Sequence, residues 1–252
     1  MFTRLLVGLD GSPHADAALE QAVVLGKRFR SLIVVAAVEE SDKGGAEAAA
    51  ALIDRGRFRV ESAGLDVDAR QQHGAPDLAL AELAKDVDAV LVGRRGVETE
   101  RQGPAALGHT AASLIRLSER TVIVCGGAAS PMQVCAVAFD GRNRRALDLA
   151  ARFASVAGST VHVIHACVDR SEGMRILGQA EAELSLLGVT FQTHLEEGSA
   201  GQVVGRVVRA IRADSLFAGA HVPRGPMERR ASVASHTEDI LLHTDIPVAI
   251  QP

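Results

Sequence analysis

Short apolar runs alternate with longer mixed stretches along the first half of the chain. The runs are continuously apolar, which is typical of parallel strands that helices cover on both faces. They predict strands at residues 4–9, 32–38, 67–72, 89–92 and 121–125. The intervening stretches predict helices at residues 13–29, 46–63, 76–86 and 110–118. This strand–helix alternation predicts a doubly wound, Rossmann-like α/β domain with a five-stranded parallel sheet.

Residues with special backbone preferences mark the ends of these helices. Ser12 and Pro13 suit the N-cap and first position of the first helix. Gly64 suits the end of the second helix, and Pro76 the start of the third. The helix boundaries therefore rest on local chemistry as well as on the apolar pattern.

The second half of the chain repeats the first. Residues 5–11, Leu-Leu-Val-Gly-Leu-Asp-Gly, resemble residues 135–141, Cys-Ala-Val-Ala-Phe-Asp-Gly. Later, residues 90–93 are echoed by residues 216–219. Such internal repetition predicts a tandem duplication. The two domains are expected at residues 1–127 and 132–252, joined through the small, turn-forming segment Gly126-Gly127-Ala128-Ala129-Ser130-Pro131.

Composition narrows the class of protein. A chain of 252 residues has room for two domains of ordinary size, and its net charge of −4 gives no reason to expect nucleic acid or an anionic membrane as a partner. No apolar run is long enough to span a bilayer, and the N-terminus lacks a signal-peptide pattern. The widely spaced Cys125, Cys135 and Cys167 are expected to be reduced core thiols in a cytoplasmic protein.

Two motifs follow strands that would end at the same edge of the sheet. Asp10 follows the first predicted strand and Gly93 ends the fourth, and ligands of doubly wound sheets bind outside the carboxyl ends of strands. Gly96 comes next, and Gly108 precedes the last helix. Glycines and a helix N-terminus together favour phosphate. If the first and fourth strands are neighbours, the carboxylate would suit a ribose hydroxyl or an adenine edge, and the glycines would hold the phosphates.

These motifs together resemble the universal stress protein family in its tandem, two-domain form. The resemblance rests on Asp10-Gly11-Ser12, on the helix signature Ala18-Leu19-x-x-Ala22 and on Gly93-x-x-Gly96 followed by Gly108. It implies the strand order 3-2-1-4-5, pairing of domains through their fifth strands, and adenine nucleotide binding in members that keep the whole loop. In those members, the acidic residue after strand one and the main chain at the end of strand two hold the nucleoside. Here these would be Asp10 and residues 37–38.

The first-half loop departs from the family pattern of Gly-x-x-Gly, nine residues, then Gly followed by Ser or Thr. Its spacer is eleven residues long, and His109 stands where the small hydroxyl residue is expected, with Thr110 after it. His109 suits either a donor to phosphate or a surface position. Of Arg94 and Arg95, at most one is expected to face the site, because the loop is rich in charges of both signs.

The second-half loop departs further. Asp140 and Gly219 are kept, but Val222 and Ala234 replace the later glycines. Ser235 stands at the hydroxyl position, yet Ser-His-Thr-Glu at residues 235–238 is also a capping box. Similarly, Asp10 and Asp140 suit an Asp-Gly turn as well as a ligand, and Ser12 suits an N-cap better than a ligand contact. The first half is therefore expected to have the better phosphate loop.

The sequence thus predicts a stress-response protein that binds ATP or AMP, with or without Mg²⁺, in its first domain and acts through conformation or a protein partner. The first alternative is a nucleotide-free interaction module whose halves form an intramolecular pseudo-dimer, and the second is a slow ATPase. No catalytic set or metal-ligand spacing is found. The candidate cofactor-binding residues are Gly8, Leu9, Asp10, Ala37, Val38, Val92, Gly93, Arg95, Gly96, Gly108, His109 and Thr110, with Asp140, Gly219 and Ser235 as second-domain equivalents.

Overall fold

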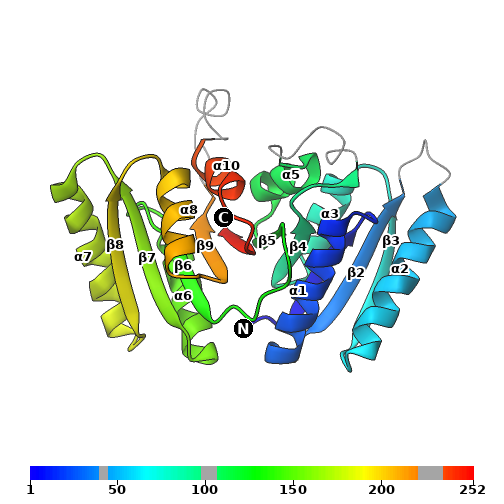
Figure 1. Cartoon of the computed structure of the whole chain (residues 1–252). Helices are drawn as coiled ribbons and strands as arrows, with labels where there is room; N and C mark the ends of the chain where they lie inside the picture. Colours follow the sequence, from blue (N-terminus) through cyan, green and yellow to red (C-terminus); the bar gives the residue numbers. More distant parts are fainter. Residues whose placement is uncertain (40–44, 98–106, 221–234) are drawn as a thin grey trace. The chain divides into compact units, whose positions relative to one another are not determined.

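The computed structural model describes the chain except for residues 40–44, 98–106 and 221–234 and the side chains of residues 235 and 236. The described chain divides into two compact units, Met1–Pro131 and Met132–Pro252 (Figure 1). Within the described residues, every helix is too short or too polar to cross a membrane.

The first unit is a parallel five-stranded sheet with helices on both faces. Its strands are β1 (Arg4–Leu9), β2 (Leu32–Glu39), β3 (Val67–His73), β4 (Ala89–Gly93) and β5 (Thr121–Cys125). They lie in the order β3-β2-β1-β4-β5, which confirms the predicted order. Its helices are α1 (Pro13–Phe29), α2 (Gly45–Ser62), α3 (Pro76–Ala84) and α5 (His109–Leu117). Helices α1 and α2 lie on one face of the sheet, and α3 and α5 on the other (Figure 1).

The second unit repeats this architecture. Its strands are β6 (Val134–Ala138), β7 (Thr160–Cys167), β8 (Phe191–Glu197), β9 (Ser215–Gly219) and β10 (Val248–Gln251). Their parallel order is β8-β7-β6-β9-β10. Its helices are α6 (Arg144–Ala157), α7 (Arg170–Leu186), α8 (Ala200–Ala210) and α10 (Ser235–Leu242). Helices α6 and α7 pack on one face, with α8 and α10 on the other.

Local chemistry sets the helix ends as the sequence predicts. The Ser12 hydroxyl accepts a hydrogen bond from the Ala15 N–H, and Pro13 begins α1. Gly64, just beyond α2, has a φ of +77°, a conformation that glycine adopts without steric cost. Helix α3 ends at Ala84, two residues before its predicted end, and Pro76 begins it. The other first-unit helix ends lie within one residue of their predicted positions.

Buried apolar side chains form the core of each unit. Leu5, Leu6 and Val7 of β1 are fully buried, as is Phe217 of β9. All three cysteines are free and buried, as predicted. Burial raises the pKa of Cys125 to about 12, which keeps this thiol protonated and unreactive at neutral pH.

Candidate functional site

Asp10 follows β1 at the carboxyl edge of the first sheet, where β1 lies beside β4. Its Oδ1 accepts a hydrogen bond from the Ser12 N–H at 2.9 Å, and Gly11 between them has a φ of +82°. Its Oδ2 lies against Gly96, where an added Cβ would come within 2.6 Å of it. One carboxylate oxygen therefore shapes the Asp-Gly turn, and the other faces the glycine loop.

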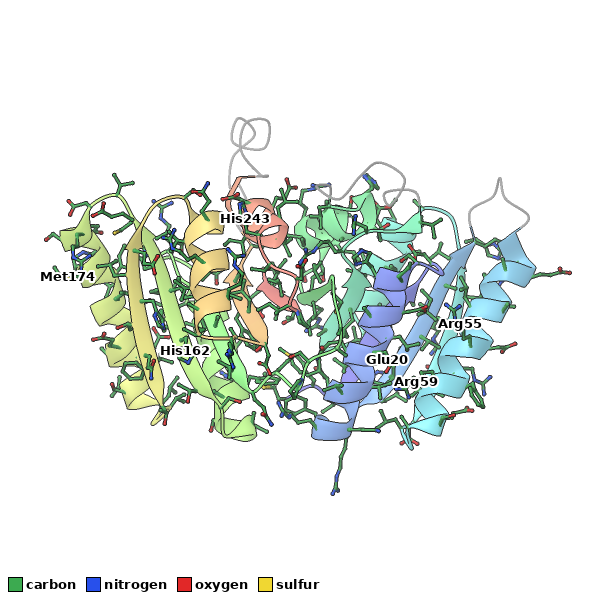
Figure 2. All side chains as sticks on the ribbon, in the orientation of Figure 1. Glu20, Arg55, Arg59, His162, Met174 and His243 are labelled. Carbon is green, nitrogen blue, oxygen red and sulfur yellow. The ribbon has the colours of Figure 1, made fainter. Side chains whose placement is uncertain are left out.

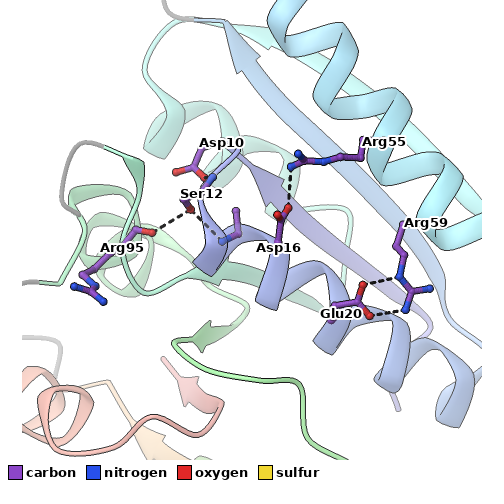
Figure 3. Close-up of polar contacts among 8 residues, drawn as sticks. Asp10, Ser12, Asp16, Glu20, Arg55, Arg59 and Arg95 are labelled. Atoms are coloured by element: carbon purple, nitrogen blue, oxygen red, sulfur yellow. Dashed lines mark hydrogen bonds and ion pairs between the residues drawn. The ribbon is translucent and has the colours of Figure 1, made fainter. Parts of the chain in front are cut away.

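The first turn of α1 supports the start of that loop. The Ser12 hydroxyl donates a hydrogen bond to the Arg95 carbonyl at 3.2 Å (Figure 3). Gly93 packs against the α1 backbone, because an added Cβ would lie 2.7 Å from the His14 carbonyl carbon and 2.8 Å from the Ala15 nitrogen. Glycine is needed here for close approach of two backbones.

Gly108 brings the far end of the loop back to its start. Its N–H donates to the Arg94 carbonyl at 2.8 Å, and an added Cβ would lie 3.3 Å from the Arg95 Cα and 3.4 Å from the Gly96 nitrogen. Gly108 is also the N-cap of α5, and within the described residues no side chain caps this helix. The first-turn N–H groups of α5 therefore begin beside Gly96, as phosphate binding requires.

Glycine is needed at the loop positions because there is no space for a side chain, and not because the backbone conformation is unusual. Gly93, Gly96 and Gly108 do not have a positive φ. Each instead lies where a Cβ would meet neighbouring atoms at or below 3.4 Å. A larger residue in this loop would act through crowding.

The two loop arginines point to different places. The Arg94 side chain is buried at the end of β5, where an added Cβ at Gly126 would lie 2.7 Å from its Cζ. The Arg95 guanidinium lies 2.9 Å, through its Nη2, from the His14 Nε2. The expectation that at most one arginine faces the site agrees with the burial of Arg94.

His109 turns toward α3. Its Nε2 lies 3.4 Å from the Asp77 Oδ2, while 82% of its side chain is exposed. This position favours the surface alternative over a donor to phosphate. Thr110 is half-buried in the first turn of α5.

The candidates at the ends of the central strands lie on both faces of the sheet. Gly8 and Val92 face α3, since an added Cβ at Gly8 would lie 2.8 Å from the Leu80 Cδ1 and 3.6 Å from Val92. Leu9 packs instead on α2, and its register partner Ala37 is buried. The next β2 residue, Val38, is half-buried. A ligand at this edge would therefore meet these residues together only through their main chain.

The corresponding edge of the second unit keeps the aspartate, Asp140, but the space beside it is filled by the side chain of Asn143. Asp140 accepts hydrogen bonds from the backbone N–H groups of Arg142 and Asn143. The Asn143 side chain caps α6, donates to the Gln251 carbonyl at 3.3 Å, and covers Gly219 so closely that an added Cβ would overlap it. Asn143 thus occupies the space at the end of β9.

Part of the second-unit loop lies outside the described residues. Val222 and Ala234 fall there, as do the side chains of Ser235 and His236 and hence the predicted capping box. Ser235 begins α10, and the Thr237 hydroxyl donates to the Gly219 carbonyl at 3.2 Å.

Comparison with known proteins settles the family. The model described as "Universal stress protein family" matches residues 1–126 and, a second time, residues 134–252. The chain belongs to the universal stress protein family. It is a tandem member, because each of its two halves matches the family model.

Solved structures share this universal stress protein fold. A universal stress protein from Archaeoglobus fulgidus DSM 4304 superimposes with a TM-score of 0.80 at 19% identity, covering 98% of this chain and 95% of that one. A functionally unknown protein from Pseudomonas aeruginosa PAO1 gives 0.73 at 18% identity, with 99% and 92% covered. Comparison with curated proteins finds no match.

Three residues that the sequence did not single out contact candidate residues of these two universal stress protein units. His14 holds Arg95, Asp77 faces His109, and Asn143 covers Gly219. Asn143 carried a usable signal, because it precedes α6 as Ser12 precedes α1. Across the described residues, no group of three or more His, Cys, Asp or Glu side chains is placed to hold a metal ion.

Proposed function

We propose that the first unit binds an adenine nucleotide, ATP or AMP, at the carboxyl edge of its sheet. The observation that carries this proposal is the position of Asp10, whose Oδ2 faces Gly96 next to the start of α5. A carboxylate accepts hydrogen bonds from hydroxyl groups and repels phosphate. The ribose therefore belongs at Asp10, and the phosphates belong at the N–H groups of α5 and the loop glycines.

The remaining candidates divide according to what they offer such a ligand. Gly8, Leu9, Ala37, Val38 and Val92 supply main-chain groups at the ends of β1, β2 and β4, which suits the edge of a base. Arg95 contributes through its backbone, while its guanidinium stays with His14. Mg²⁺ would accompany the phosphates of ATP.

The nucleotide would act as a signal rather than as a substrate. The proposed output is a change of conformation or the binding of a protein partner in a cytoplasmic stress response. A slow ATPase activity is the weaker alternative, and phosphate release from ATP in the presence of Mg²⁺ would measure it. The second unit is proposed to bind nucleotide less well, because Asn143 fills the space beside Gly219.

A nucleotide-free interaction module is the second candidate function. It is favoured by the direction of His109, which turns toward Asp77 where the family pattern has a small hydroxyl residue. In that case the edge of the first sheet would be a protein-binding surface, and a second copy or another protein would be the ligand.

Replacing Gly96 separates the two candidates. Gly96 has an ordinary φ, so alanine can adopt its backbone conformation. The new Cβ would, however, lie 2.6 Å from the Asp10 Oδ2 and would push the carboxylate away. Gly96→Ala should weaken ATP binding by roughly tenfold or more in a calorimetric titration, since it moves a ligand-bonding group. Gly178→Ala is the matched control, because Gly178 of α7 has open space around it. Equal ATP affinity in wild type and Gly96→Ala would contradict the proposal.

A further inference from the structure

We infer that Ser12 is a positioning residue of the phosphate loop, which it ties to the first turn of α1 through the Arg95 carbonyl. This inference rests on the proposed function of the first unit. Ser12 does not need to touch the nucleotide, because its effect passes through the loop backbone.

The hydroxyl of Ser12 makes two hydrogen bonds that use different parts of the group. It accepts from the Ala15 N–H at 3.1 Å, which is the N-cap bond, and it donates its own hydrogen to the Arg95 carbonyl at 3.2 Å (Figure 3). The side chain is buried, with 1% of the residue exposed. Only a residue with both an acceptor and a donor can fill this place.

The Ser12 backbone adds a third connection. Its N–H donates to the Asp10 Oδ1 at 2.9 Å. One residue therefore joins the carboxylate assigned to the ribose, the start of α1 and the loop assigned to the phosphates. The relative position of the two halves of the proposed site depends on this residue.

The bond to Arg95 also sets the direction of the next N–H group. In a trans peptide unit the carbonyl and the following N–H point in opposite directions. Because the Arg95 carbonyl points at Ser12, the Gly96 N–H points away from α1. The bond between the Gly108 N–H and the Arg94 carbonyl at 2.8 Å holds the neighbouring peptide unit in the same segment.

Among the described residues, the N-caps of α6 and α8 make different hydrogen bonds. Ser199 caps α8 by accepting from the Gln202 N–H at 3.4 Å. Asn143 caps α6, and its donor goes to the Gln251 carbonyl of β10. The hydrogen bond from an N-cap to the loop is therefore found in the first unit, which keeps the loop glycines. In the second unit, the Asn143 side chain donates to β10 instead.

The test compares ATP with adenosine, which lacks phosphates. Ser12→Ala removes the donor to Arg95 together with the N-cap of α1. Because the loop loses its attachment, ATP affinity should fall by roughly tenfold, while adenosine affinity stays unchanged. Ser12→Thr keeps both bonds and should restore ATP affinity. Ser199→Ala is the matched control, because it removes a cap of α8 and should leave both affinities unchanged. An equal loss for ATP and adenosine, or no loss for ATP, would overturn the inference.

Failure of the proposed function would be recognised separately. If wild type binds neither ATP nor adenosine, the nucleotide proposal is wrong, and the role of Ser12 is then measured by amide hydrogen exchange. Ser12→Ala should accelerate exchange at residues 94–97 more than in the body of α1, since the loop loses its attachment while the helix keeps its tertiary packing. Unchanged exchange in this segment would overturn the inference.

Discussion

The two units have the same sheet order and an aspartate in the same place, but the first turns of α1 and α6 treat the neighbouring strand end differently. In the first unit, this turn presents the Ser12 hydroxyl to the loop and packs its backbone on Gly93. In the second unit, the Asn143 side chain covers Gly219 and bonds to Gln251. The same fold thus packs the end of β4 against the backbone of α1 and covers the end of β9 with a side chain.

A second contrast lies at the end of the second strand of each unit. The sixth residue of β2 is Ala37, whereas the sixth residue of β7 is His165, whose Nδ1 lies 2.7 Å from the Phe139 carbonyl. Gly173 of α7 makes room for this imidazole, because an added Cβ would lie 3.3 Å from the His165 Cδ2. The larger side chain is accommodated by a smaller neighbour, so the difference is one of packing rather than of fold.

The largest expected effect comes from filling the space under α1. Gly93→Ala places a Cβ 2.7 to 2.8 Å from main-chain atoms of α1, which cannot rotate away. It should lower the unfolding free energy of the first unit by about 1 to 3 kcal/mol, the usual cost of overpacking. Native-state hydrogen exchange measures this for each unit separately.

Gly219→Ala is the counterpart in the second unit and sharpens the comparison. Its Cβ would meet the Asn143 side chain, whose amide can rotate away but whose own Cβ also overlaps and is fixed by the backbone of Asn143. The cost should therefore be comparable to that of Gly93→Ala, and Asn143→Ser should reduce it only in part, by removing the overlapping amide. A clearly smaller cost than for Gly93→Ala would show that the start of α6 moves aside more readily than α1 does.

A smaller effect is expected from pH, through a histidine pair in the second unit alone. The His162 Nδ1 lies 3.0 Å from the His194 Nε2 on the α8 face of β7 and β8 (Figure 2 labels His162). Glu196 and Arg206 form an ion pair on the same face. Burial lowers the pKa of both histidines, and for His162 the charge of His194 lowers it further, whereas Glu196 opposes the shift at His194.

The sign follows from proton binding. Since both folded-state pKa values lie below the ordinary 6.5, the unfolded chain binds more protons near that pH. Stability of the second unit is therefore complete above pH 6.5 and falls as the pH drops below it. Exchange-derived stability measured between about pH 5 and 8 should show this slope. His162→Val introduces the residue that stands at the matching third position of β2, Val34, and should flatten the slope of stability against pH. An unchanged slope would show that other groups cause the pH dependence.

The smallest expected effect concerns ion pairs on the α1–α2 face. Glu20 pairs with Arg59 and Asp16 with Arg55, so two pairs join the helices (Figure 3). Glu20→Gln should cost about 0.2 to 1 kcal/mol, because exposed pairs contribute little. The second unit's Asp148–Arg152 pair lies within α6, so Asp148→Asn should not affect packing between helices. Loss of the Glu20→Gln effect at high salt would support an electrostatic origin.

Much of the fold could be predicted because its causes are local. Continuous apolar runs, Ser12 at a helix start and Gly64 at a helix end act within a few residues of themselves. The proximity of Asp10 to the loop also followed, given that β1 and β4 are neighbours.

The details of the site could not be predicted, because they depend on contacts between distant residues. The Arg95–His14 and His109–Asp77 contacts join residues far apart in the sequence. Residue identity also does not reveal that Gly96 has an ordinary φ and is needed for space. The candidates at the strand ends were chosen because they are adjacent in the sequence. Successive residues of a strand point to opposite faces of the sheet, however, so Gly8 and Leu9 face different helices.

The most direct test of the difference between the units is a calorimetric titration of ATP into wild type, Asp10→Asn and Asp140→Asn. The Oδ1 of asparagine can still accept the turn hydrogen bonds, but an NH2 group then replaces the second carboxylate oxygen, and an NH2 group cannot accept from a ribose hydroxyl. We predict a single site per chain in wild type, a loss of affinity in Asp10→Asn and unchanged binding in Asp140→Asn. Binding that survives in Asp10→Asn, or that is lost in Asp140→Asn, would contradict the account.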